Sequence, residues 1–381
     1  MFYIHYSWSL ALLSTIIYLI MILVARPWIT WFNPRRNNIK SGIYFFTFLL
    51  IINSIFAFYD HDTYHYWEQF HIAGFYQQYN IQAYESVYNW LATVVGNKYF
   101  LWRACIFVPA CLFIYYTAKR LRLLNRNFLV VMILFGCFLA YTRAMLGHMV
   151  LLFGFVLLVN NESSKSDRIM GFILLFASYF LHKSMYINLI FVLAACLIPF
   201  NRKICICSLI AFPFLAMVTT YVVDYVLDAN IQLNEGVGNV EGSTEFYLKA
   251  QVQRIDFNII GQVRNTIEGS GLFLAYIYIY NRLYIRKYLN RKRDKVYFYL
   301  FRLAFWCTYV AYLFYFNQDV SGWIFHRFRY MGYFPLLFVL TKVISIENRS
   351  NWWIRWIIIL TLMANLAARY STINHWYHGL L

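Results

Sequence analysis

Several acidic and imidazole side chains in this sequence stand directly beside long apolar runs. Asp60 and Asp62 come immediately after one run, and Glu85 lies in the polar segment that follows. His182 ends another run. A carboxylate or an imidazole can take a proton from a hydroxyl group when its pKa is near neutral, and partial burial moves a carboxyl pKa in that direction. These four residues are the candidate general bases.

A second set of side chains suits a phosphate or pyrophosphate ligand. Most of its members are basic, and guanidinium groups offer forked donors that match phosphate oxygens. In the alternative interpretation, each cation reaches the lipid headgroups or pairs with a nearby carboxylate. One shared anion site is favoured because several members occupy the ends of separate apolar runs. The candidate ligand-binding residues are Tyr64, Arg103, Arg143, Lys183, His326, Arg327, Arg329 and Tyr330.

No metal or cofactor is expected. The Asp60-x-Asp62 pair looks like a divalent-metal motif, but hard cations normally need more oxygen ligands than two side chains supply. The sequence has no glycine-rich phosphate loop and no GxSxG nucleophile motif. Nucleotide-driven chemistry and hydrolase triads therefore have no support.

The elements that must position these residues are membrane-spanning helices. Hydrophobic residues make up 61% of the 381 residues and charged residues 13%, which is outside the range of soluble domains. The uncharged runs 8–25 and 41–59 are each long enough to cross about 30 Å of hydrocarbon as a helix. We predict an all-α polytopic membrane protein with a single transmembrane domain over residues 1–381. Its twelve helices are expected near 8–25, 41–59, 99–118, 128–142, 144–159, 169–181, 184–200, 204–223, 266–285, 296–316, 322–341 and 352–370.

Basic residues set the expected orientation. The net charge of +17 is concentrated in every second short loop, most strongly in 282–295, as in cytoplasmic loops of membrane proteins. This distribution argues against a nucleic-acid partner and places both termini outside. The outer loops 60–98 and 224–265 each contain apolar residues at helical spacing, which predicts amphipathic helices in the membrane interface. These residues are Val87, Trp90, Leu91 and Val94 in the first loop and Leu248, Val252, Ile255 and Ile259 in the second.

The order of these motifs resembles EpsG-like proteins, which belong among the Wzy-type polymerases of bacterial surface polysaccharides. The resemblance covers roughly residues 40–340 and rests on short segments. They are Asp60 to Tyr64, Tyr84-Glu85, Arg103, Thr142-Arg143-Ala144, His182-Lys183-Ser184 and Arg327 to Tyr330. The Pro-Gly that often follows the Glu in relatives is absent after Glu85.

The resemblance implies a GT-C-like enzyme at the outer face of the bacterial cytoplasmic membrane. Such an enzyme joins oligosaccharide repeat units carried on undecaprenyl pyrophosphate into capsule, exopolysaccharide or O-antigen. Its partners would be these lipid-linked oligosaccharides, the bilayer and other polysaccharide export or chain-length proteins. Two alternatives remain open: a transporter or flippase of lipid-linked oligosaccharides, and a membrane acyltransferase that modifies polysaccharide. The first would place its site near the midplane between repeated halves.

The orientation can be tested with single-cysteine variants in intact cells. A membrane-impermeant thiol reagent should label a cysteine at position 241 and leave one at position 291 unlabelled, because the positively charged loop stays in the cytoplasm. Labelling at position 291 with protection at position 241 would reverse the orientation. That result would also contradict an active site at the outer face of the membrane.

Overall fold

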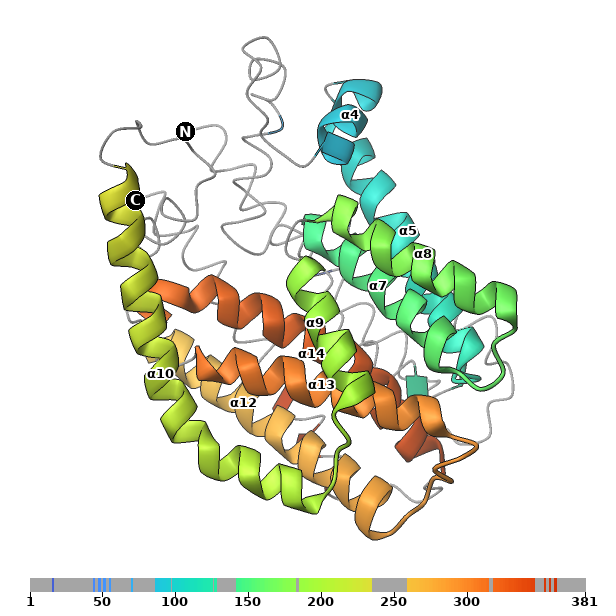
Figure 1. Cartoon of the computed structure of the whole chain (residues 1–381). Helices are drawn as coiled ribbons and strands as arrows, with labels where there is room; N and C mark the ends of the chain where they lie inside the picture. Colours follow the sequence, from blue (N-terminus) through green and yellow to red (C-terminus); the bar gives the residue numbers. More distant parts are fainter. Residues whose placement is uncertain are drawn as a thin grey trace.

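The computed structural model is helical throughout the elements that it describes, and no strand occurs among them. Side chains are described for 87–96, 98–125, 127–128, 144–182, 185–221, 269–314 and 328–346, and the helical backbone alone for 86, 142–143, 222–234, 259–268 and 318–327. Isolated residues are also described at 16, 44, 47–48, 51–52, 55, 70, 353, 356–357 and 360–361. The helices are α4 (Ser86–Val95), α5 (Tyr99–Arg120), α7 (Thr142–Val159), α8 (Lys165–Leu181), α9 (Met185–Leu197), α10 (Arg202–Asn234), α12 (Ile259–Tyr280) with the π-helical turn η3 (Asn281–Ile285), α13 (Lys295–Leu313) and α14 (Gln318–Ile346) (Figure 1).

The predicted helical, multi-pass architecture is confirmed. Among the described residues, four helices are long and apolar enough to cross a membrane: Tyr99–Arg120, Arg202–Tyr221, Lys295–Leu313 and Phe328–Ile346. Shorter apolar helices cover Ala144–Val159 and Met185–Leu197. The predicted helices 8–25, 41–59, 128–142 and 352–370 lie outside the described residues, apart from isolated positions. The total of twelve spans and the GT-C-like arrangement therefore stay predictions.

Several of the described helices are longer than their apolar runs suggest, among them α8, α10 and α14. The start of α8 lies at Lys165 instead of 169, because Ser164 and Asp167 form a capping box in which each side chain accepts the other's backbone N–H. In α10 the helix continues to Asn234, so the first part of the predicted outer loop 224–265 is helical. The predicted amphipathic helix at 248–259 falls outside the described residues, except for Ile259 at the start of α12.

The other predicted amphipathic helix is present as α4. Tyr88 and Ala92 are buried against the protein. Val87, Trp90 and Val94 are exposed, Trp90 at 64% and Val94 at 62%. An exposed apolar stripe on a short helix that joins a membrane-spanning helix suits the lipid interface. The Trp102 indole N–H of α5 donates to the Tyr88 carbonyl of α4 at 3.1 Å, and this hydrogen bond connects the two helices.

Glycines allow the closest contact between helices. A methyl group on Gly154 of α7 would lie 2.9 Å from the Gly171 carbonyl oxygen, and one on Gly171 of α8 would lie 2.8 Å from the Gly154 carbonyl oxygen. Such close backbone approach is typical of helix pairs in membranes. The opposite face of α8 is apolar and exposed, so the α7–α8 hairpin lies at the edge of the helices seen in Figure 1.

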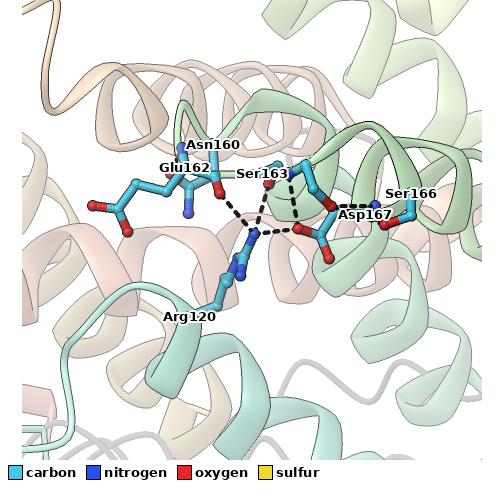
Figure 2. A network of polar contacts seen from close by, with 7 residues as sticks. Arg120, Asn160, Glu162, Ser163, Ser166 and Asp167 are labelled. Atoms are coloured by element: carbon cyan, nitrogen blue, oxygen red, sulfur yellow. Dashed lines mark hydrogen bonds and ion pairs between the residues drawn. The ribbon is translucent and has the colours of Figure 1, made fainter.

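One end of the molecule collects the predicted cytoplasmic loops. We call it the basic end, and it comprises residues 119–125, 160–168, 281–295 and 341–346. Arg120 binds Asp167 at 2.5 Å and the Glu162 carbonyl at 3.1 Å, joining the end of α5 to the α7–α8 loop (Figure 2). Hydrogen bonds from the Ser164 backbone and hydroxyl, with the Arg120 charge, hold the pKa of Asp167 below its usual range.

Further polar contacts connect the other loops of the basic end. The Tyr297 hydroxyl donates to the Leu121 carbonyl at 2.7 Å, and the Asn125 amide donates to Ser345 at 2.8 Å. The Asn161 amide donates to the Lys292 carbonyl. Because α5, α7 and α14 finish at this end, their first turns lie toward the opposite end. The described parts of four loops that were assigned to one side by charge therefore share one end of the structure.

The α7–α8 contact gives a stability test. Gly171→Leu should lower the melting temperature of the purified protein in detergent, because no space exists for the side chain and overpacking costs about 1–3 kcal/mol. Phe172→Leu, on the same helix, is the control because the Phe172 side chain is 68% exposed. Equal melting temperatures for the two variants would contradict the close contact.

Candidate active site

A buried polar contact joins three helices that run in the same direction. His148 of α7 places its Nδ1 atom 3.2 Å from the Met331 sulfur of α14 and 3.4 Å from the Asn188 amide nitrogen of α9. All three side chains are buried, with exposed fractions of 4% for His148 and 2% for Asn188. We call His148, Asn188 and Met331 the polar floor. It lies close to the starts of α7 and α9, toward the end opposite the basic end.

The helical register places two predicted ligand-binding positions one turn above this floor. Arg143 precedes Gly147 by four residues, and Arg327 precedes Met331 by four residues, so each pair shares one face of its helix. A methyl group on Gly147 would lie 3.5 Å from Cβ of His182. Position 143 therefore shares the face of α7 that adjoins His182, and position 327 shares the face of α14 that meets His148.

The connection between α8 and α9 fixes His182. Its backbone N–H donates to the Ser178 carbonyl at 3.2 Å, and its carbonyl accepts from the Met185 N–H at 2.9 Å. His182 thus caps α8 while it begins the turn into α9, and it is buried, with 4% of its surface exposed. The tight turn holds His182 beside Gly147 of α7.

Arg103 lies in a neighbouring aromatic cluster. It is fully buried one turn into α5, donates to the Tyr99 hydroxyl at 3.2 Å, and lies 5.0 Å from the centre of the Phe107 ring. Trp102 and Tyr88 belong to the same cluster. Leu146 of α7 packs both against this cluster and against the main core that contains Met331, so α7 separates Arg103 from the polar floor.

Arg329 lies on α14 but away from the Arg327 position. Two residues along an α-helix correspond to a rotation of about 200°, so positions 327 and 329 occupy opposite sides of α14. The Arg329 guanidinium is buried and lies 5.4 Å from the Tyr330 ring centre and 5.7 Å from that of Tyr333. The predicted Arg327/Arg329 pair is thus divided between two faces of the helix.

The remaining predicted site residues are not placed. Asp60, Asp62, Tyr64, Glu85 and Lys183 lie outside the described residues, and for Arg143, His326 and Arg327 only the helical backbone is described. Their roles stay predictions. Within the described part of the chain, no group of three or more His, Cys, Asp or Glu side chains could hold a metal ion.

His148 and Asn188 were not identified from the sequence. A signal existed, because Asn188 is the one amide in the otherwise apolar α9 segment, and polar side chains inside membrane helices tend to be functional. Its Oδ1 atom is buried and accepts no hydrogen bond from the described residues. The Asn188 Oδ1 atom is therefore a buried hydrogen-bond acceptor close to the His148 imidazole.

These features define a multi-pass helical membrane protein with buried polar groups beneath one end of its helices. The family model described as the EpsG family matches residues 40–381, and the chain belongs to this family. It is thereby a membrane protein of polysaccharide biosynthesis. No curated protein and no solved structure matches the chain.

The polar floor can be tested by a double-mutant cycle. His148→Phe and Asn188→Leu should each lower stability, while the double variant should be less destabilised than their sum, since both partners of a buried contact are then replaced by apolar groups. A coupling of about 0.5–3 kcal/mol is expected from thermal unfolding in detergent. The control combines His148→Phe with Asn125→Ala at the basic end, and these two effects should add. Additivity in both cycles would show that His148 and Asn188 do not interact.

Proposed function

We propose that this protein is a polymerase that joins oligosaccharide repeat units carried on undecaprenyl pyrophosphate. The reaction takes place at the outer face of the bacterial cytoplasmic membrane and lengthens a surface polysaccharide or exopolysaccharide. The observation that supports this proposal is the buried contact of His148 with Asn188 near the starts of α7 and α9, close to His182. Membership of the EpsG family supports the substrate class.

The proposed ligand is an anion with an attached lipid. Arg143 and Arg327 would bind pyrophosphate oxygens through forked donors, and the first turns of α7 and α9 direct the positive ends of their helix dipoles toward the same region. A site surrounded by apolar helices strengthens these interactions because its dielectric is low. The lipid tail of the substrate can stay in the bilayer while its pyrophosphate binds between the helices.

In the proposed reaction, an acceptor sugar hydroxyl attacks the anomeric carbon of the donor repeat unit. The new glycosidic C–O bond forms as the bond between that carbon and the pyrophosphate oxygen breaks. Arg143 and Arg327 stabilise the negative charge that develops on the departing lipid pyrophosphate. Asp60, Asp62, Glu85 or His182 takes the hydroxyl proton. The pyrophosphate linkage already activates the donor, so nucleotide sugar is not required.

Reconstitution tests this proposal. Purified protein in detergent should convert synthetic lipid-pyrophosphate repeat units into a ladder of longer products without ATP or nucleotide sugar. A transporter would leave chain length unchanged, because detergent removes the two sides of the membrane. A well-folded wild-type protein that gives no ladder would contradict the polymerase.

Variants assign the residues in the same assay. Arg143→Lys should remain folded and lose the ladder, because a lysine point charge cannot replace the forked donors. Arg168→Lys, at the basic end, is the matched control and should keep full activity. An amide in place of the true base, as in Asp62→Asn or Glu85→Gln, should lower the rate by about 10² to 10⁴. A ladder that persists in both amide variants would favour His182 as the base.

A further inference from the structure

Carboxylates at the basic end are already engaged. Glu162, Asp167 and Asp294 are the acidic residues whose side chains the structure describes, and each forms an ion pair. Arg122 binds Glu162 at 3.0 Å, and Lys342 lies 3.8 Å from Asp294. Cations elsewhere at this end therefore need another source of negative charge.

Three cations at the basic end gather around two tyrosine rings. The Lys295 ammonium and the Arg302 guanidinium each lie 5.1 Å from the centre of the Tyr299 ring. Arg291 lies 5.7 Å from the centre of the Tyr284 ring, and Arg302 acts electrostatically on the Tyr284 hydroxyl. We call Arg291, Lys295 and Arg302 the cation cluster. Within the described part of the chain, none of its members has a carboxylate at ion-pair distance.

The cluster extends into the apolar part of the helices. Arg302 is two turns into α13, about 10 Å from the start of that helix. Its guanidinium donates to the Ala195 carbonyl near the end of α9, at 3.5 Å. A guanidinium at this depth is costly without a counter-charge, and cation–π contacts with tyrosine compensate only part of that cost.

The surface beside the cluster is apolar and exposed. Leu197 at the end of α9 is 76% exposed, and Ile285 at the end of η3 is 63% exposed. Arg302 reaches the Ala195 carbonyl, two residues before Leu197, and the Phe200 ring lies 5.6 Å from the Tyr284 ring, so the charges adjoin the ends of α9 and η3. A ligand that matches both has an anionic head and hydrocarbon chains.

We propose that the cation cluster binds the phosphate of an anionic phospholipid from the adjoining leaflet, with the acyl chains beside Leu197 and Ile285. The phosphate oxygens accept hydrogen bonds from the Arg302 and Arg291 guanidinium groups and from the Lys295 ammonium. This contact relieves the repulsion among three like charges. The site lies at the opposite end of α9 and α13 from the proposed sugar-transfer site, so neither proposal depends on the other.

Lipid titration of the purified full-length protein tests the site. Phosphatidylglycerol should raise the melting temperature in neutral detergent and remain bound in native mass spectra, whereas phosphatidylcholine should do neither. Arg291→Gln combined with Lys295→Gln should weaken phosphatidylglycerol binding about thirtyfold, from two contributions near the membrane surface. Both side chains are exposed, so the fold should be retained.

The control removes two charges from the same end. Lys165→Gln with Arg168→Gln, on exposed positions of α8, should leave binding unchanged. Equal losses in the two double variants would show a non-specific charge effect and overturn the site. Stabilisation by inorganic phosphate alone, at the same concentration as the lipid, would overturn the lipid assignment. Lys295→Glu supplies a single-residue check, and unaltered phosphatidylglycerol binding by this variant would also overturn the proposal.

Discussion

Polar groups within apolar helices must find their partners inside the protein, and this constraint organises the structure. His148 and Asn188 satisfy it by meeting each other and Met331 across three helices. Tyr276 and Thr308 satisfy it through a hydroxyl contact of 2.7 Å between α12 and α13. Each contact sets the rotation of its helices, because a side chain on another face of the helix could not reach. The helices that carry the candidate site are thus oriented by the polar residues they contain.

Close packing supplies the second part of the arrangement. Where Gly154 faces Gly171, the backbones of α7 and α8 approach closely, and Gly332 of α14 lies against the Ala304 carbonyl of α13. Membrane helices gain little from apolar burial against one another, because lipid tails are equally apolar. Small residues and a few hydrogen bonds therefore decide which helices are neighbours. The ion pairs of the basic end then join the end of α5 to the start of α8, and the end of α14 to the start of α13.

The sequence was a good guide to helix positions and a poor one to contacts between helices. Apolar runs predicted α5, α13 and most of α14 because a span needs a continuous uncharged segment of known length. The polar first turn of α8 was not predicted, because the prediction followed uncharged runs and the capping box of this helix contains a charged residue. Arg329 was grouped with Arg327 by proximity in the sequence, although helical geometry separates them.

The polar floor could not be derived because its members are far apart in the chain. His148 and Met331 meet only when α7 and α14 pack together, and no local pattern encodes that choice. Photocrosslinking tests the central claim most directly, with a lipid-pyrophosphate repeat unit that carries a diazirine beside the pyrophosphate. Our account predicts labelled peptides from 142–148, 182–188 or 324–331, with labelling reduced by excess unmodified substrate. Labelling confined to 282–295 or to the exposed face of α8 would contradict it.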